Sequence, residues 1–215
     1  MRKIAQAAFL FLLGVTAVEA AEQFYEVGGM AGGGLLNTTT LTSTAGSATA
    51  GFKPGAVFGV LVGNQMYSRL SGEARYLYQM SDLKLASGGT EVTFGGQTHL
   101  IHYDLIYQVS PRQSKVKLFI AGGGGVKVFR GTGTEAAYQP LGNFAYLTKT
   151  RQVEPMLSVG GGMKVPLNPH TFLRVEIRDF LSPFPDQVIA PAPHVSGGGW
   201  LHDLVPTVGI SYTFK

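Results

Sequence analysis

Hydrophobic and polar residues alternate with a period of two along several stretches of this 215-residue chain. In the stretch 69–78, Glu73 and Arg75 share one parity, whereas Tyr76 falls on the other. Successive side chains of a β-strand point to opposite faces, so this alternation predicts a strand with one polar and one apolar face. Eight such strands are predicted, at 24–33, 55–63, 69–78, 101–107, 116–128, 153–165, 172–179 and 206–214.

The charged residues test this assignment independently, because within one strand they must share a parity. Nearly all of them fall on the polar parity, and Asp179, near a strand end, is the exception. Two prolines, Pro155 and Pro206, interrupt the hydrogen-bonding potential of their strands, so we expect the pairing to fray or bulge there.

The connections between the predicted strands are alternately short and long. Three short links carry turn residues, at 64–67, 110–114 and 168–170, and four long segments lie at 35–53, 81–96, 131–149 and 182–202. This layout predicts an all-β fold: a single eight-stranded antiparallel up-and-down transmembrane β-barrel. Short turns connect the strands at one end of the barrel, and long loops connect them at the other, elaborated rim. The segment 35–50 is rich in Thr, Ser, Ala and Gly, so we expect it to be mobile.

A soluble eight-stranded barrel would show the same alternation turned inside out, with the charged face toward water. Three features favour the membrane version. Aromatic residues of the apolar face lie toward strand ends, as interfacial girdles do. The polar face mixes charges of both signs with many of the 30 glycines, and charged residues make up only 14% of the chain against about 25% in an average soluble domain.

The first twenty residues predict a cleavable secretory signal peptide, followed by one barrel domain over 21–215. Arg2 and Lys3 precede an apolar run, and Val18-Glu19-Ala20 supplies small residues at the cleavage positions. Cleavage would leave fifteen basic and twelve acidic residues, a net charge of +3. With no basic cluster, a nucleic-acid partner is not expected. Beyond the signal, no stretch approaches 18 uninterrupted apolar residues, so only strands are available to cross a membrane.

The last predicted strand reads Val208-Gly-Ile-Ser-Tyr-Thr-Phe214, and with the signal peptide and the eight alternating strands it resembles small outer-membrane barrels of the OmpA membrane-domain and OmpX type. Gly209, Tyr212 and Phe214 are similar to the C-terminal assembly signal of that family, although Lys215 follows the phenylalanine here. The resemblance implies location in the bacterial outer membrane, with membrane lipids and lipopolysaccharide as surroundings and the barrel-assembly machinery as a partner. It says nothing about activity, and we expect a monomer.

The polar parity gathers five acids and five bases inside the predicted barrel: Glu26, Glu73, Asp104, Glu154 and Glu176 with Arg75, Lys117, Lys127, Arg174 and Arg178. An eight-stranded barrel is just wide enough for side chains, so a water-filled pore is not expected. Buried unpaired charge costs several kcal/mol per ion, so these ten side chains should form a salt-bridge network. A structural plug is the favoured interpretation, and a proton or ion path is the alternative.

Two further interpretations concern chemistry and contact. His102 and Asp104 share a face and could belong to a hydrolase or metal site, but no His-x-Ser pattern accompanies them, so we expect an interior pair and neither enzymatic activity nor a cofactor or metal. Apolar residues in the long segments are candidate loop contacts for an unknown surface ligand, or else lipid anchors or loops folding on themselves: Tyr138, Phe144, Tyr146, Phe184 and Trp200. The sequence thus predicts a structural or surface-interaction role, with a small-solute channel and a lipid A-modifying enzyme as alternatives.

Overall fold

The structure, a computed structural model, describes residues 24–44, 46–111 and 113–215. The predicted signal peptide at 1–20 lies outside these residues. Among the described residues there is no helix long and apolar enough to cross a membrane.

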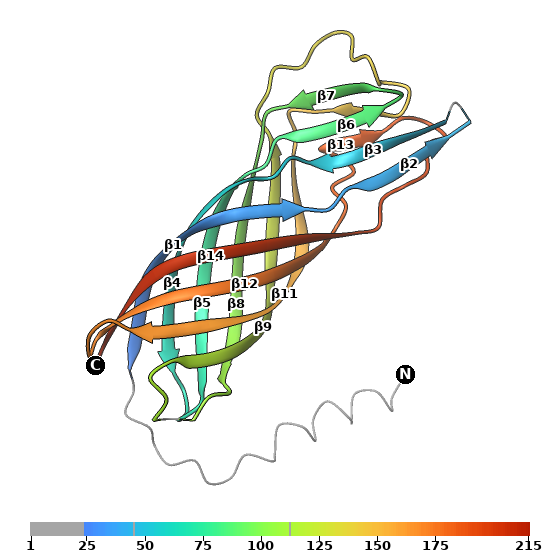
Figure 1. Ribbon diagram of the computed structural model, residues 1–215. Coiled ribbons are helices and arrows are strands. Elements are labelled where there is room, and N and C mark those ends of the chain that lie inside the picture. Colours follow the sequence, from blue (N-terminus) through green and yellow to red (C-terminus); the bar gives the residue numbers. More distant parts are fainter. Residues whose placement is uncertain (1–23, 45, 112) are drawn as a thin grey trace, which may run out of the picture.

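Eight of the strands in the described residues close into one antiparallel barrel, at the positions that the alternation predicts (Figure 1). Their order around the barrel is β1-β14-β12-β11-β9-β8-β5-β4. Their bounds are β1 Tyr25–Leu36, β4 Gly55–Gln65, β5 Leu70–Met80, β8 Gly96–Gln108, β9 Lys117–Gly131, β11 Arg151–Pro166, β12 Thr171–Pro183 and β14 Trp200–Phe214. The predicted fold class is confirmed, and most strands extend several residues beyond their predicted ends toward the elaborated rim.

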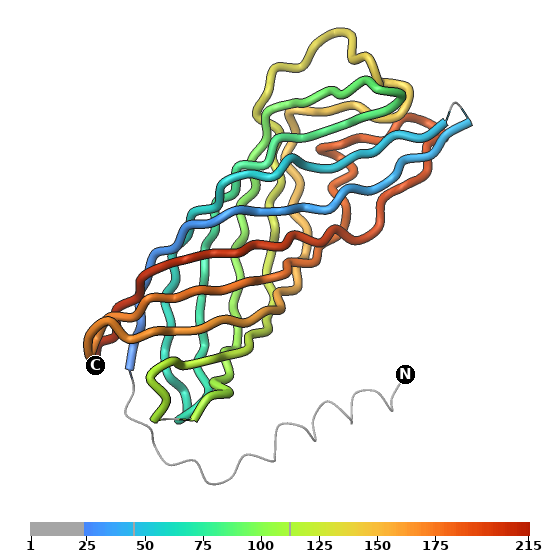
Figure 2. Tube along the Cα trace, viewed as in Figure 1, coloured from blue at the N-terminus to red at the C-terminus, as the bar shows by residue number. Residues whose placement is uncertain are grey.

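The first and last strands of the barrel meet and close it. Tyr25 of β1 is opposite Phe214 of β14, and on its other side it is opposite Asn64 of β4. The short turns and the C-terminus therefore lie at one end, and the long connections lie at the other (Figure 2). We call these the short-turn end and the cap end.

At the cap end the long connections fold into small sheets of their own. One sheet contains β2 Thr39–Ser43, β3 Gly46–Phe52, β6 Leu83–Ser87 and β7 Thr90–Phe94, and β10 Ala145–Leu147 pairs with β13 Ile189–Pro191. We call these six strands and their connections the cap. The expectation of a mobile segment at 35–50 is wrong: most of it forms the β2–β3 hairpin, because Leu41 and Ala50 are fully buried in an apolar cluster shared with β6, β10 and β13.

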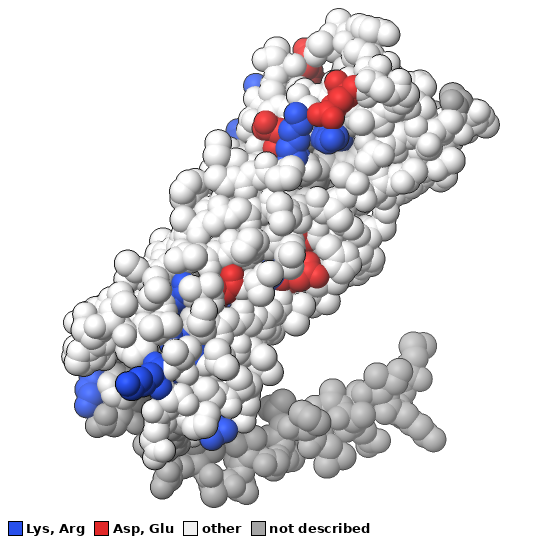
Figure 3. All heavy atoms as spheres, in the orientation of Figure 1, with Lys and Arg blue, Asp and Glu red and all other residues white. Residues whose placement is uncertain are grey.

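The two faces of the wall have opposite chemistry, and this excludes the soluble alternative. Outward-facing Val60, Ile120 and Leu157 are each more than half exposed, whereas inward-facing Arg174 and Arg178 are each 2% exposed. Figure 3 shows the result on one side of the protein: the wall between the two ends is mostly free of charged atoms. A barrel with an apolar exterior and a charged interior is built for lipid.

The two strand prolines lie at local interruptions of the pairing, as expected. Pro155 keeps its place opposite Val126 of β9, and the β11–β12 ladder begins only at Leu157. Around Pro206, the β1–β14 pairing is interrupted after Thr207 and resumes at Leu204 in the same register. Each proline therefore lies where one ladder frays, and neither produces a bulge.

Candidate functional site

The inward side chains divide the barrel interior into layers along its axis. From the short-turn end toward the cap, the inward residues of β5 are Glu73 and Arg75, then Leu77, then Gln79. The same order recurs on β8 (Asp104, His102, Leu100, Thr98), on β12 (Arg174, Glu176, Arg178, Phe180, Ser182) and on β14 (Thr207, Val205, Asp203). We call these the ion-pair layer, the apolar layer and the upper polar layer.

Arg174 is the hub of the ion-pair layer. Its guanidinium is 2.7 Å from Glu26 Oε1, 2.9 Å from Glu73 Oε1 and 2.7 Å from Glu176 Oε1. These partners come from three different strands, β1, β5 and β12. One planar side chain with five N–H donors therefore joins strands that are far apart in the sequence.

Two further arginines extend the network across the lumen. Arg75 Nη1 is 2.8 Å from Glu176 Oε2, and the same guanidinium also binds Glu73. Arg178 Nη1 is 2.8 Å from Asp104 Oδ2, and its Nη2 is 3.1 Å from Glu176. The β5, β8 and β12 segments of the wall are thus tied together through buried charge-assisted hydrogen bonds.

The ion-pair layer is electrically balanced. Its members are four carboxylates and four basic side chains: Glu26, Glu73, Asp104 and Glu176 with Arg75, Lys164, Arg174 and Arg178. Moving an ion out of water costs several kcal/mol even after relaxation, and only close, hydrogen-bonded partners repay this cost. The layer is therefore electrically neutral as a whole, and its charges are paired with one another inside the barrel.

Inward glycines make room for these long side chains. At Gly160 a Cβ would lie 2.7 Å from Arg178 Cδ, and at Gly162 it would lie 2.9 Å from Glu176 Cγ. At Gly123 it would overlap the carbonyl oxygen of Tyr103 and crowd Asp104. The glycine-rich stretches of β9 and β11 therefore lie opposite the charged side chains of β8 and β12 and leave room for them.

The upper polar layer contains a second, separate ion pair. Lys127 Nζ is 2.6 Å from Asp203 Oδ2, and both side chains are fully buried. Gln79 donates a hydrogen bond of 3.2 Å to the other Asp203 oxygen, and Ser81 and Thr98 hydrogen-bond to each other at 2.7 Å. The apolar layer separates this pair from the ion-pair layer, so the interior charges form two networks rather than one.

The structure pairs eight of the ten predicted interior charges and leaves two apart. Lys117 Nζ lies 5.0 Å from the centre of the Phe172 ring near the short-turn end, and Glu154 accepts a hydrogen bond from Gln152 near the cap. Neither has an ion-pair partner within the described part of the chain. Both lie at an end of the lumen, where water can replace a partner.

The sequence prediction missed two members of these networks, Lys164 and Asp203. Lys164 shares the polar parity of β11 and is 2.6 Å from Glu26 Oε2. Asp203 shares the parity of Thr207, but the last strand was predicted to begin only at 206. Parity within the predicted strand 153–165 was enough to identify Lys164, whereas Asp203 required the last strand to be carried to its real start at Trp200.

His102 lies inside the barrel, as expected. Its Nδ1 is 3.0 Å from Asp104 Oδ2, although not in hydrogen-bonding geometry, and its ring meets Phe180 edge-on. The side chain is fully buried. Asp179, the exception to the parity rule, faces outward and is 2.8 Å from His202 Nδ1.

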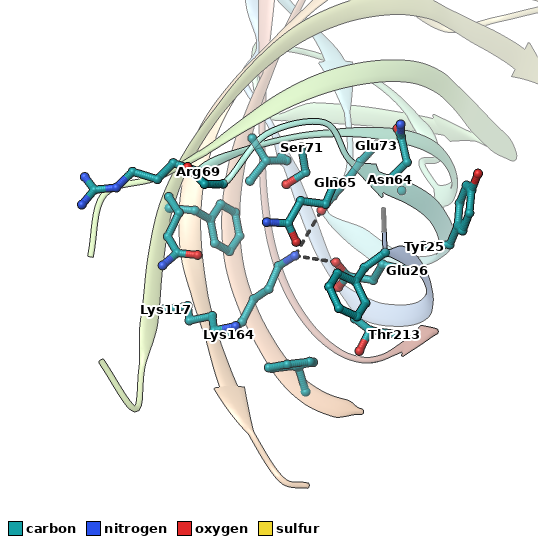
Figure 4. A pocket seen from close by; sticks show the side chains of 17 residues that line it. Tyr25, Glu26, Asn64, Gln65, Arg69, Ser71, Glu73, Lys117, Lys164 and Thr213 are labelled. Carbon is teal, nitrogen blue, oxygen red and sulfur yellow. Dashed lines mark hydrogen bonds and ion pairs between the residues drawn. The ribbon is translucent and has the colours of Figure 1, made fainter. Parts of the chain in front are cut away.

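A cavity of about 90 Å³ opens at the short-turn end of the lumen. Figure 4 shows Lys164 between Glu26 and Glu73 in this cavity, whereas Arg69 points away from it. Lys117, Phe119 and Phe172 complete its inner wall. The cavity ends against the ion-pair layer, because Glu73 belongs to both.

The predicted loop contacts divide into buried and exposed residues. Phe144 and Phe184 are 5% and 6% exposed, and they pack with Val188 and Ile189 in the apolar cluster of the cap. They are therefore not available as contacts, because the long connections fold on themselves. The remaining three are exposed, namely Tyr138, Tyr146 and Trp200.

Phe144→Leu should loosen the cap without unfolding the barrel. The shorter side chain leaves part of the apolar cluster unfilled, at a cost of about 1 kcal/mol. We expect faster proteolytic cleavage within 131–149, measured on the folded protein in detergent. Tyr138→Leu is the control, because Tyr138 is 77% exposed, and equal cleavage rates in the two variants would contradict the assignment.

An exposed ion-pair cluster lies on the outer sheet of the cap. Glu91 of β7 is 2.9 Å from Lys84 Nζ and 3.2 Å from Lys53 Nζ. Hydrogen bonds from Lys84 and Lys53 hold the pKa of the Glu91 carboxyl below its ordinary value. The Glu91 carboxyl is solvent-exposed, so the cluster adds local order rather than much stability.

The three residues of the predicted C-terminal assembly signal lie on the last strand at the short-turn end. Tyr212 and Phe214 face outward, with ring centres 6.5 Å apart, and Phe214 also stacks on Tyr25 at 5.9 Å. Gly209 faces inward, where a Cβ would lie 2.9 Å from Met30 Cβ. The aromatic pair thus lies on the exterior next to the closing seam.

Solved structures of similar shape are outer-membrane barrels. The protein aligns with OprG from Pseudomonas aeruginosa at a TM-score of 0.60, with 14% identity over 92% of this chain and 98% of that one. It aligns with Neisserial surface protein A (NspA) at a TM-score of 0.54, with 14% identity over 90% of this chain and all of that one. At this identity the likeness concerns the fold alone. No curated protein sequence matches the chain significantly.

A comparison with protein-family models shows the family of the chain as well as its fold. The model described as the outer membrane protein beta-barrel domain matches residues 7–214, nearly the entire chain. The match agrees with the apolar exterior, the paired charges of the interior and the closure of β1 on β14. This chain therefore belongs to the outer membrane beta-barrel family and is a small barrel protein of the bacterial outer membrane.

Proposed function

We propose that this protein is a closed, non-conducting barrel whose folded cap is a platform for contacts at the cell surface. The observation that carries the proposal is the cap itself. Its sixteen buried residues, contributed by all four long connections and the strand ends next to them, form one apolar cluster. Because the cap is already ordered by its own core, it loses little further conformational entropy when it binds a partner.

The interior of the barrel supports the absence of conduction. The balanced ion-pair layer, the apolar layer and the Lys127–Asp203 pair follow one another along the axis. Buried Phe129 of β9, which stacks on Phe52 at 5.2 Å, continues the obstruction into the cap. A hydrated ion would have to break buried charge pairs and cross an apolar layer.

Exposed aromatic residues of the cap, and of the end of β14 next to it, support a contact role. Tyr138, Tyr146 and Trp200 are 77%, 49% and 56% exposed. Tyr and Trp are enriched at protein interfaces, because they bury a large area and lose few rotamers. We propose no enzymatic role, since His102 lies next to Arg178 and Phe180 in the closed interior, where a lipid substrate has no access.

Planar-bilayer recording tests the closed barrel. We expect purified folded protein to give a flat current trace at moderate voltage. Discrete steps would overturn this part of the proposal and favour solute transport. The double variant Lys127→Ala and Asp203→Ala removes the upper ion pair but leaves the ion-pair layer, so it should also stay closed.

Cell-surface assays test the platform. Replacing Tyr138, Tyr146 and Trp200 together by Ser should abolish adhesion or autoaggregation of cells that express the protein, while the unboiled protein still migrates as a folded barrel. The control replaces three exposed polar residues of the cap by Ser, namely Thr90, Thr93 and Asn143. An equal phenotype for both variants and the wild type would count against the platform.

A further inference from the structure

Two arginines lie side by side on the outer wall. Arg130 of β9 and Arg151 of β11 are direct cross-strand partners, and both side chains are exposed. Cβ atoms of such opposite residues are about 4.5–5.5 Å apart, and like charges there repel each other. Neither guanidinium has an ion-pair partner among the residues that the structure describes. The wall thus presents two adjacent positive charges without a carboxylate to balance them.

These arginines mark the upper edge of the lipid-facing surface. On β9 every outward residue from Leu118 to Val128 is apolar or glycine, and the next outward residue is Arg130. On β11 the outward residues from Val165 back to Val153 are likewise apolar or glycine, and the next is Arg151. Both charges therefore lie where the hydrocarbon region ends and the lipid headgroups begin.

The neighbouring strands place interfacial side chains at the same level. Gln97 of β8 is the cross-strand partner of Arg130, and Tyr78 of β5 is the partner of His99. Tyr76 Oη is 2.8 Å from His99 Nδ1, and Tyr78 donates a 3.3 Å hydrogen bond to Gln97 Oε1. Tyrosines with one apolar and one polar end are typical of the headgroup level. Along β8, the distance from outward Tyr107 to His99 is about 26 Å of strand. At a tilt of roughly 40° this spans a height of about 20 Å, most of an apolar band that is about 25 Å tall.

We propose that Arg130 and Arg151, flanked by Gln97, bind a phosphate group of an outer-leaflet glycolipid. Arginine presents a planar fork of donors that fits phosphate oxygens, and two forks side by side can hold one phosphomonoester from two directions. A dianionic phosphate also removes the repulsion between the two guanidiniums. The adjacent sector of the wall, over β12 and β14, has different chemistry at its upper edge, since Asp179 and His202 are paired with each other there. The site therefore occupies one sector of the barrel, over β8, β9 and β11.

Titration with labelled bisphosphoryl lipid A in detergent micelles tests the site. The double variant Arg130→Gln and Arg151→Gln should bind at least about tenfold more weakly than the wild type, because it loses two charge-assisted contacts. The charge-matched control is Arg69→Gln with Lys115→Gln, two exposed cations at the short-turn end. It should bind within about twofold of the wild type. Equal affinity of the wild type and the Arg130/Arg151 variant would overturn the proposal.

Two further arms identify the group that is bound. Dephosphorylated lipid A should bind the wild type and the double variant with the same affinity, because it lacks the group that the two arginines contact. If the wild type binds dephosphorylated and bisphosphoryl lipid A equally well, the acyl chains suffice for binding and the proposal is wrong. Inorganic phosphate at millimolar concentration should not displace the lipid, and displacement would assign the site to a free anion instead. Bisphosphoryl lipid A should also raise the unfolding temperature of the wild type more than that of the variant. Arg130→Lys with Arg151→Lys keeps the charge but loses the fork, and should bind with intermediate affinity.

Discussion

Arg174→Ala should lower the free energy of unfolding by about 3–5 kcal/mol, the largest effect of any single substitution considered for this barrel. The variant leaves Glu26, Glu73 and Glu176 without the guanidinium that all three share. Arg75 still neutralises part of the charge on Glu73 and Glu176, but the ion-pair layer becomes net negative in a buried site. Urea titration of the protein folded into lipid vesicles, followed by gel migration of unboiled samples, measures the loss.

Lys117→Ala is the matched control for Arg174→Ala. It also removes an inward basic side chain, but Lys117 lies over the Phe172 ring and is not among the described ion pairs. Its removal should cost less than about 1 kcal/mol. Equal losses in the two variants would mean that general loss of positive charge, rather than the pairing around Arg174, sets the stability.

Gly123→Val should cost more than about 3 kcal/mol and could prevent closure altogether, since overpacking here meets backbone. The new side chain would overlap the carbonyl oxygen of Tyr103 on the adjacent strand and displace Asp104 from Arg178. No rotamer relieves a clash that begins at Cβ. The yield of folded barrel and its midpoint in urea are the measurements.

The neighbouring substitution Gly122→Val provides the comparison. Gly122 faces outward, and the nearest atom to a Cβ there is the Ser158 carbonyl oxygen at 3.8 Å. The added valine would enter lipid on a strand that favours β-branched residues, so stability should stay within about 1 kcal/mol of the wild type. A larger loss at Gly122 than at Gly123 would contradict the inward assignment of Gly123.

Parity explains why the strands and the interior charges were predictable. Each side chain of a strand points to one of only two faces, and nearly all charged side chains point to the same one, the barrel interior. The partners were not predictable, because parity gives a face but neither a height along the axis nor the strand across the lumen. Glu26 and Arg174 are 148 residues apart in sequence, and only closure of the barrel brings them together.

The cap was harder to predict for a different reason. The segment 35–50 is so rich in Thr, Ser and Ala that its few large apolar residues, Leu41 among them, carry little periodic signal. Their packing partners are remote, with Leu85 from the second long connection and Val188 from the fourth. The composition of a segment indicates whether it can form ordered structure alone. This hairpin is ordered instead by an apolar cluster to which all four long connections contribute.

The seam between β1 and β14 has a consequence for biogenesis. Since the first strand pairs with the last, no partial chain emerging from the ribosome can close, and the ion-pair layer stays open and wet until β14 arrives. Strands whose charges are still hydrated are poor candidates for premature insertion into the first membrane that the chain meets. The same side chains that form the buried ion pairs of the folded barrel would thus keep the unfolded chain hydrated until it reaches the outer membrane.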